Sequence, residues 1–169
     1  MLRRRPAVQR RADGTFTVQL AKPERALLKT LADQMSELLT ESPEDPSLRR
    51  LSPTAYPTDP ERDAEYQLIA GEELRTARQA ALDVLVATAE RKTLDEDELV
   101  AWMQTVNGVR LVLGTRLDVS EDDDPTELDP ASPDAAGYAL YHYLGVLLHD
   151  VVSALAAALP PSRSSRWKR

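Results

Sequence analysis

The chain contains no cysteine and few aromatic residues, and each scarcity limits what the protein can be. Without thiols there are no disulfide bonds, no thiol redox sensing, no cysteine-ligated zinc and no cysteine nucleophile. Aromatic residues make up 5% of the chain and hydrophobic residues 42%, so alanine and leucine must fill most of the core, as in helix bundles. Twelve prolines against six glycines indicate stiff connections.

Long hydrophobic runs are also missing from the sequence. No stretch reaches the roughly 18 consecutive apolar residues that span a membrane. The most apolar segment, residues 138–159, includes His142, His149 and Asp150, and we therefore expect a buried helix of a soluble protein. The N-terminal arginines are not followed by an apolar segment, so they do not form a secretory signal. These absences predict a cytoplasmic protein without membrane contact.

Positive charge is concentrated at the two ends of this acidic chain, whose net charge is −7. Residues 12–162 contain 12 basic and 28 acidic residues, so the body should repel nucleic acid. The N-terminal cluster is therefore the candidate contact for DNA or for an acidic partner; the alternative is that it is solvated or pairs with the acidic body. This cluster consists of Arg3, Arg4, Arg5, Arg10 and Arg11.

A β-hairpin is predicted within residues 1–21. Phe16, Val18 and Leu20 alternate with polar residues, which is the period of a half-buried strand, and Asp13-Gly14 is a tight-turn signal before them. Because an isolated two-stranded hairpin is marginal in water, it should pack on a helix or pair with a partner.

Helical periodicity predicts four main helices, at residues 23–40, 60–91, 94–117 and 133–159. Asp59 followed by Pro60, the pair Thr93 and Glu96, and Ser132-Pro133 are the predicted helix starts, and Gly71 is a predicted kink or break. On the second helix the positions expected to face the core are Leu68, Ile69, Leu74, Leu82, Leu85 and Val86.

The predicted fold is mainly α, a bundle of about four main helices with a small N-terminal β-hairpin. We expect one domain over residues 1–160, with an exposed acidic loop at 118–133 and a disordered basic tail at 161–169. The hairpin and the alanine-rich end of the last helix also suggest a homodimer.

Catalytic, cofactor and metal motifs are absent from the sequence, which predicts a protein that is not an enzyme. Asp122-Asp123-Asp124 lacks the ligand spacing of a calcium loop. His142 and His149 lie two helical turns apart, about 10 Å, which is too far to share a metal by themselves. A helix-turn-helix at residues 82–95 and beyond is rejected because its recognition helix would begin with four acidic residues.

Two arginines interrupt the apolar phrase NGVRLVLGTRL at residues 107–117. An arginine on such a helix must extend to solvent or find a carboxylate. We expect Arg110 or Arg116 to form an ion pair with a neighbouring helix, through Glu61, Asp63 or Glu65; the alternative is an arginine that faces a partner.

Two phrases, LSPTAYP at residues 51–57 and VNGVRLVLGTRL at 106–117, resemble an actinobacterial family of unknown function, DUF2017, across nearly the whole chain. This family includes an oxidative-stress transcriptional regulator, and its genes often lie near a protease adaptor. The family-motif positions, whose role is unknown, are Ser52, Tyr56, Asn107, Arg110 and Arg116.

The resemblance implies a cytoplasmic, non-enzymatic regulatory protein that is related to transcription. We expect it to act through protein contacts; the residues themselves, and not the resemblance, suggest a second copy of the chain as a partner and DNA contact at the basic N-terminus. The alternative is a protein-only adaptor or scaffold linked to proteolysis or cysteine metabolism. Because this chain has no cysteine, it cannot sense oxidants through a disulfide.

Overall fold

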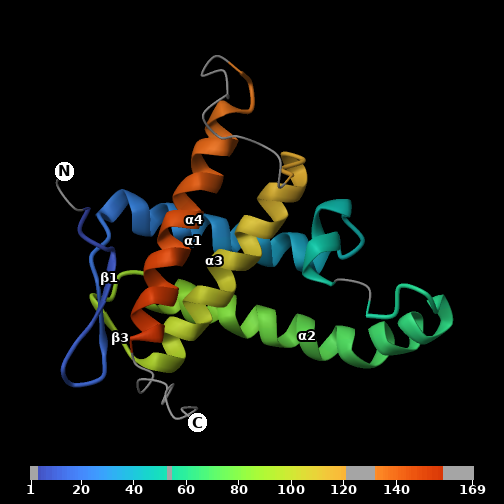
Figure 1. The fold of residues 1–169 in the computed structure, drawn as a ribbon, viewed down its shortest axis with the longest axis horizontal. Coiled ribbons are helices and arrows are strands. Elements are labelled where there is room, and N and C mark those ends of the chain that lie inside the picture. The colour runs from blue at the N-terminus through green and yellow to red at the C-terminus, as the bar shows by residue number, and fades with distance from the viewer. Residues whose placement is uncertain (1–3, 53–54, 121–131, 158–169) are drawn as a thin grey trace, which may run out of the picture.

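The computed structural model describes residues 4–52, 55–120 and 132–157, and helices dominate it (Figure 1). The predicted mainly α class, with four main helices and an N-terminal hairpin, is confirmed. The predicted tail at residues 161–169 and most of the predicted acidic loop lie outside the described residues. The elements are β1 (Val8–Arg10), β2 (Phe16–Val18), α1 (Lys22–Glu41), the 3-10 helix η1 (Pro46–Leu51), α2 (Pro60–Thr88), β3 (Thr93–Leu94), α3 (Glu96–Arg116) and α4 (Ala135–Ala156).

The predicted hairpin forms, and it gains a third strand that the sequence did not reveal. β1 and β2 pair antiparallel, with Val8 opposite Val18, and Gly14 takes a positive φ of 86° in the turn. β3 pairs antiparallel with β2, so the strand order is β1-β2-β3. The partner that the hairpin needs therefore comes from the connection between α2 and α3, and α4 packs against β1.

The helix ends confirm one predicted cap and correct two others. The Asp59 carboxylate accepts a hydrogen bond from the Arg62 backbone N–H at 3.1 Å, as expected. The capping box of α3 is formed by Asp95 and Glu98 rather than by Thr93 and Glu96, because Thr93 belongs to β3. Helix α4 starts at Ala135 after Asp134, so Ser132-Pro133 is not its cap, and α2 continues through Gly71 without a break.

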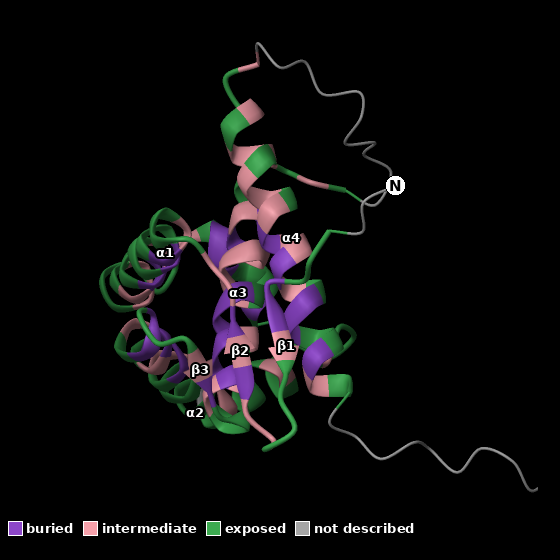
Figure 2. Ribbon diagram, turned by 90° about the vertical axis from the view of Figure 1, so that its left-hand side faces the viewer, coloured by how far each residue is buried: buried purple, intermediate pink, exposed green. Residues whose placement is uncertain are grey.

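The core lies where α3 meets the sheet and the other helices. α3 packs against α4, α2, η1 and α1, and Figure 2 shows the buried residues gathered around it and on the strands. Trp102 and Phe16 are the largest side chains that are completely enclosed. The others are Leu85, Leu94, Leu99, Leu144, Leu147, Val106 and Val151.

The predicted core face of α2 is wrong in its first half. Leu82 and Leu85 are buried as expected, but Ile69 is 80% exposed and Leu74 is 39% exposed. Figure 1 shows that the first turns of α2 extend beyond α3 and α4. Leu74 lies farther along the helix and lines a pocket together with residues of α1 and η1. The Leu68 side chain lies outside the described residues, and Val86 is partly buried against the core.

Of the described helices, α4 is the one that is long and apolar enough to cross a membrane, judged by length and composition only. A core helix of a soluble protein passes the same test, and α4 packs against α3 and β1. Its Asp150 is buried and hydrogen-bonded, and this placement agrees with the predicted role as a helix of the bundle.

Candidate functional site

The N-terminal segment is fastened to α4 by one buried carboxylate. Asp150 is 5% exposed, and its Oδ2 accepts from the Arg4 guanidinium at 2.6 Å and from the Ala7 backbone N–H at 2.7 Å. A hydrogen bond between charged groups that is partly removed from water is stronger than a surface contact. Arg4 therefore anchors the N-terminal segment to α4, while its side chain remains 57% exposed.

The remaining arginines of the N-terminal cluster differ in how far they are engaged. Arg11 lies 3.5 Å from the Asp13 carboxylate and donates to the Thr93 hydroxyl at 3.5 Å. Arg5 and Arg10 are exposed and have no ion-pair partner within the described part of the chain, while Arg3 lies outside it. The free positive charge of the described cluster is thus carried by Arg5 and Arg10.

The loop before α2 holds Tyr56 against the first turns of that helix. The Asp63 carboxylate accepts from the backbone N–H of Ala55 at 2.7 Å and of Tyr56 at 3.1 Å. The Tyr56 ring meets Tyr66 edge to face, with centroids 6.1 Å apart, and the Arg62 guanidinium lies 4.6 Å from its centroid. The sequence motif around Tyr56 therefore orders the start of α2. Ser52, at the end of η1, is exposed.

The expected ion pair of Arg110 is wrong, because its guanidinium lies over an aromatic ring. The Cζ atom is 4.2 Å from the centroid of Tyr141 on α4, which is a cation–π contact. No carboxylate of the described segments lies within 4.0 Å of Arg110, and its Nε is buried without a hydrogen-bond partner there. A Cβ at Gly145 would lie 3.3 Å from that Nε, so this glycine makes room for the arginine.

Glycines in the same motif allow α3 and α4 to approach closely. A Cβ at Gly114 would lie only 2.9 Å from Tyr141 Cε2 and 3.4 Å from the Arg50 guanidinium. Gly137 of α4 is similarly covered by Leu117, at 2.9 Å. The residues of the phrase NGVRLVLGTRL thus determine how α3 packs, and Arg110 joins α3 to α4 through its contact with the Tyr141 ring.

Arg116 and Asn107 are exposed, and neither lies in an ion pair within the described ranges. Arg116 is close enough to Asp45 to contribute to a lowered pKa of that carboxyl group. The larger causes are hydrogen bonds from the Ser47 hydroxyl and backbone N–H at the start of η1. Asn107 lies at the edge of a pocket.

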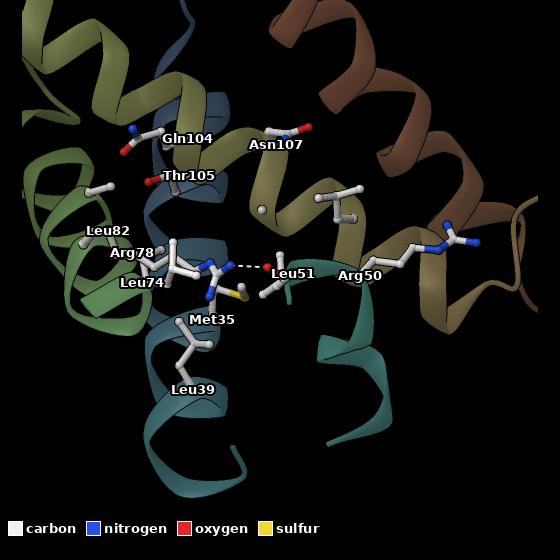
Figure 3. A pocket seen from close by; sticks show the side chains of 14 residues that line it. Met35, Leu39, Arg50, Leu51, Leu74, Arg78, Leu82, Gln104, Thr105 and Asn107 are labelled. Carbon is white, nitrogen blue, oxygen red and sulfur yellow. Dashed lines mark hydrogen bonds between the residues drawn. The ribbon is translucent and has the colours of Figure 1, made fainter. Parts of the chain in front are cut away.

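This pocket, the α1–α2–α3 pocket, lies between those three helices and η1 and has a volume of about 300 Å³ (Figure 3). Arg78 of α2 extends across it and donates to the Leu51 carbonyl oxygen of η1. Burial lowers the pKa of Arg78. Thr105 of α3 is buried, and its hydroxyl has no hydrogen-bond partner among the described residues. The apolar wall comes mainly from Met35, Leu39, Leu51, Leu74, Ala77, Ala81, Leu82 and Leu111.

Sequence reasoning missed an arginine that joins three elements at the sheet. Arg25 is 7% exposed, and its guanidinium donates to the carbonyl oxygens of Val18, Leu20, Ala89 and Arg91 at 2.7–3.1 Å. Its position three residues before Leu28, on the buried face of α1, is the signal that could have identified it.

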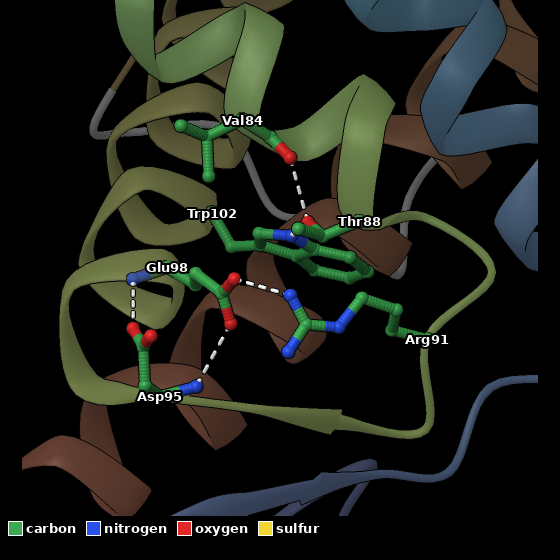
Figure 4. Close-up of polar contacts among 6 residues, drawn as sticks. All are labelled: Val84, Thr88, Arg91, Asp95, Glu98 and Trp102. Carbon is green, nitrogen blue, oxygen red and sulfur yellow. Dashed lines mark hydrogen bonds and ion pairs between the residues drawn. The ribbon is translucent and has the colours of Figure 1, made fainter.

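A second missed network surrounds the central tryptophan (Figure 4). The Trp102 indole N–H donates to the Thr88 hydroxyl at 2.8 Å, and this hydroxyl donates to the Val84 carbonyl oxygen at 2.6 Å. Next to them, Arg91 forms an ion pair with Glu98, which also accepts from the Asp95 backbone N–H at 3.0 Å. These contacts link the end of α2 to the start of α3.

The described residues contain no group of three or more His, Asp and Glu side chains placed to hold a metal. His142 and His149 are both exposed, while Asp122, Asp123 and Asp124 lie outside the described ranges.

Tyr143 of α4 donates to the Glu24 carboxylate of α1 at 3.0 Å. Burial, together with this acceptor, raises the pKa of Tyr143.

Comparison with known proteins decides the family. A model described as "Domain of unknown function (DUF2017)" matches residues 4–155, which is most of the chain. The chain belongs to the DUF2017 family. No solved structure matches it.

Several relatives of this chain carry the name of a regulator. Proteins named "Oxidative stress regulator AosR" from Mycobacterium tuberculosis and Mycobacterium bovis are 30% identical to this chain, covering 92% of it and 88% of their own length. A "Putative oxidative stress regulator AosR" from Mycobacterium leprae is 33% identical over 68% of the chain and 60% of that protein. A regulatory role is therefore what the relatives suggest, and none of these names is that of an enzyme.

Proposed function

We propose that this DUF2017 member is a non-enzymatic, cytoplasmic regulatory protein, related to transcription, that acts through protein contacts. The observation that carries the proposal is the similarity to relatives named oxidative stress regulators over 92% of the chain. The absence of cysteine excludes a thiol or a disulfide of this chain as the sensor of an oxidative signal.

The contact surface we assign to this role is the α2 arm, defined as residues 55–74. Ile69 is 80% exposed on it, and Tyr66, about one helical turn earlier, is 41% exposed. Exposed large apolar side chains that neighbour each other commonly mark a protein-binding surface. The Tyr56 loop is fixed to the first turns of this arm, so part of the surface is ordered before a partner arrives.

We also propose, more specifically, that the N-terminus contacts DNA. Arg5 and Arg10 carry the free positive charge of the N-terminal cluster, and phosphate contacts of this kind need no fixed geometry. The experiment is a gel-shift titration of the full chain with DNA from its own promoter. The test variant is Arg5→Gln/Arg10→Gln, and Lys22→Gln/Lys29→Gln on α1 is the control with the same charge loss.

We expect the test variant to bind about tenfold more weakly, with a salt dependence reduced by about two phosphate contacts. The control should bind like the parent. If the parent chain binds no DNA at low salt, the protein-only adaptor or scaffold, linked to proteolysis or cysteine metabolism, becomes the better assignment.

Self-association can be tested separately from the DNA contact and from the contact with a different protein. If the α2 arm pairs with a second copy, sedimentation velocity will show a dimer that Ile69→Glu dissociates and that Arg5→Gln/Arg10→Gln leaves intact. A parent chain that sediments as a monomer at high micromolar concentration contradicts the homodimer and leaves the arm for a different protein.

A further inference from the structure

Arg78 has more hydrogen-bond donors than the protein uses. A guanidinium carries five N–H donors, yet the acceptor that the described residues supply is the Leu51 carbonyl oxygen. No carboxylate of the described segments lies within 4.0 Å of it, and burial is the cause of its lowered pKa. A partly buried cation without a counter-ion is costly unless something else neutralises it.

Elsewhere in the fold, an arginine side chain does find several hydrogen-bond acceptors. Arg25, at the other end of α1 and α2, directs four of its five donors to carbonyl oxygens. Arg78 instead extends into an open pocket of about 300 Å³, at the lower end of the size of small-molecule sites. Figure 3 shows its guanidinium between the apolar side chains of α1 and η1.

The charges around the pocket indicate which anion fits. A guanidinium matches the two oxygens of a carboxylate in a bidentate pair. The adjoining cleft shares Leu39, Leu51 and Arg78 with the pocket, and Glu44 and Arg75 both line that cleft. Arg50, the other arginine of the pocket lining, donates to the Val119 carbonyl oxygen at 2.9 Å and points away from the apolar side chains of the pocket in Figure 3. Arg78 is therefore the cation that faces the apolar walls, and one guanidinium matches an anion with a single carboxylate.

We propose that the α1–α2–α3 pocket binds a small amphiphilic monocarboxylate, with its carboxylate on Arg78 and its apolar body along Met35, Leu74 and Leu82. Asn107 and Gln104 at the pocket edge are within the lining and supply polar neighbours for the solvent side. This site goes beyond the proposed regulatory role and does not depend on it.

Three probes of equal length test the charge requirement on the full chain. Octanoate, 1-octanol and octylammonium each have eight carbons and differ in the head group; the alkyl chain of octanoate is one methylene shorter, which by itself weakens its binding relative to octanol. In titrations followed by two-dimensional NMR of backbone amides, octanoate should bind about tenfold tighter than octanol, because only octanoate pairs with the guanidinium. Octylammonium should bind more weakly than octanol. Shifts should centre on η1 and the middle of α3.

Two variants locate the site and one serves as a matched control. Arg78→Met keeps the stem and removes the charge, so octanoate should weaken about tenfold while octanol changes little. Gly108→Leu keeps Arg78 but fills the pocket, since a Cβ there points toward Met35 and Leu51 at 3.9 and 4.0 Å, and it should block both probes. Arg62→Met, on the same helix outside the pocket, should bind like the parent.

Several results overturn the proposal. One is a parent chain that binds octanol as tightly as octanoate, or that binds no probe at millimolar concentration. Another is octanoate binding that survives in Gly108→Leu, whose folding is checked by circular dichroism. If Arg78→Met fails to fold, the comparison of the three head groups and the blocked variant Gly108→Leu still decide.

Discussion

The two ends of the bundle treat buried and partly buried polar groups in opposite ways. At the sheet end, Arg25 is bonded to four carbonyl oxygens and the Trp102 N–H to Thr88. At the η1 end, Arg78 has one described acceptor and the Thr105 hydroxyl has none within the described residues. Satisfied polar groups give rigidity, while unsatisfied groups beside a cavity are available for a ligand. Stability should therefore depend on the sheet end and binding on the η1 end.

The largest effect that would test this comparison comes from exchanging each arginine for methionine. Arg25→Met leaves four carbonyl oxygens without a charged donor, two of these bonds being fully buried, and should cost about 3–5 kcal/mol of unfolding free energy. Arg78→Met loses one bond and should cost about 1 kcal/mol. Urea unfolding followed by circular dichroism measures both; equal costs would remove the distinction between the two ends.

Glycine-to-alanine changes test helix packing with smaller expected changes in unfolding free energy. Gly114→Ala places a Cβ 2.9 Å from Tyr141, and this overpacking should destabilise by about 1–3 kcal/mol. Gly108→Ala and Gly71→Ala meet nothing closer than 3.9 Å, so the gain in helix propensity should stabilise by about 0.5–1 kcal/mol. Thermal melting of the three variants should give shifts of opposite sign, and a Gly114→Ala protein that melts above the parent would contradict the close α3–α4 contact.

Acid should affect the η1 end through Asp45. Hydrogen bonds from the Ser47 hydroxyl and backbone N–H, with a smaller effect of Arg116, place the folded pKa of Asp45 below its ordinary value of 3.8. A depressed folded pKa means that the stabilising contribution is complete above pH 3.8 and is lost as the pH falls through the folded value. The carboxyl chemical shifts of Asp45 in an NMR pH titration should show this, and Asp45→Asn should abolish that local transition.

The smallest effect should come from the α2 arm. Ile69→Ser changes a side chain that is 80% exposed, so unfolding free energy should stay within about 0.5 kcal/mol of the parent. The matched change Leu85→Ser, at a completely buried position of the same helix, should be severe. A large loss in Ile69→Ser would show that the arm is packed against something in solution.

Local patterns predicted most of the elements, because helix and hairpin signals lie within a few residues of each other. The Asp59 cap and the Asp13-Gly14 turn are examples. β3 escaped prediction because two residues are too short for a periodic pattern, and its strand character exists only through pairing with β2. The exposure of Ile69 escaped it because periodicity marks an apolar face without showing whether another element covers it.

The candidate site depended on contacts that no local pattern contains. Arg110 was expected to find a carboxylate, yet its cation–π partner Tyr141 lies on a different helix, 31 positions later. The α1–α2–α3 pocket needs four separate elements, so it has no sequence signature. Arg4 and Arg5 look alike in the sequence, and only the position of buried Asp150 separates an anchor from a free charge.

The attachment of the N-terminal segment to Asp150 also sets an order of events during synthesis. Ala7 leaves the ribosome first, but the carboxylate that holds it is translated 143 residues later. At about 5–20 residues per second, this interval lasts roughly 7 to 29 seconds. Throughout that time the outer edge of β1 has neither its anchor nor the helix that packs on it. A nascent chain stalled before α4 should therefore expose a pairing-competent strand, and it is the species on which chaperones would act.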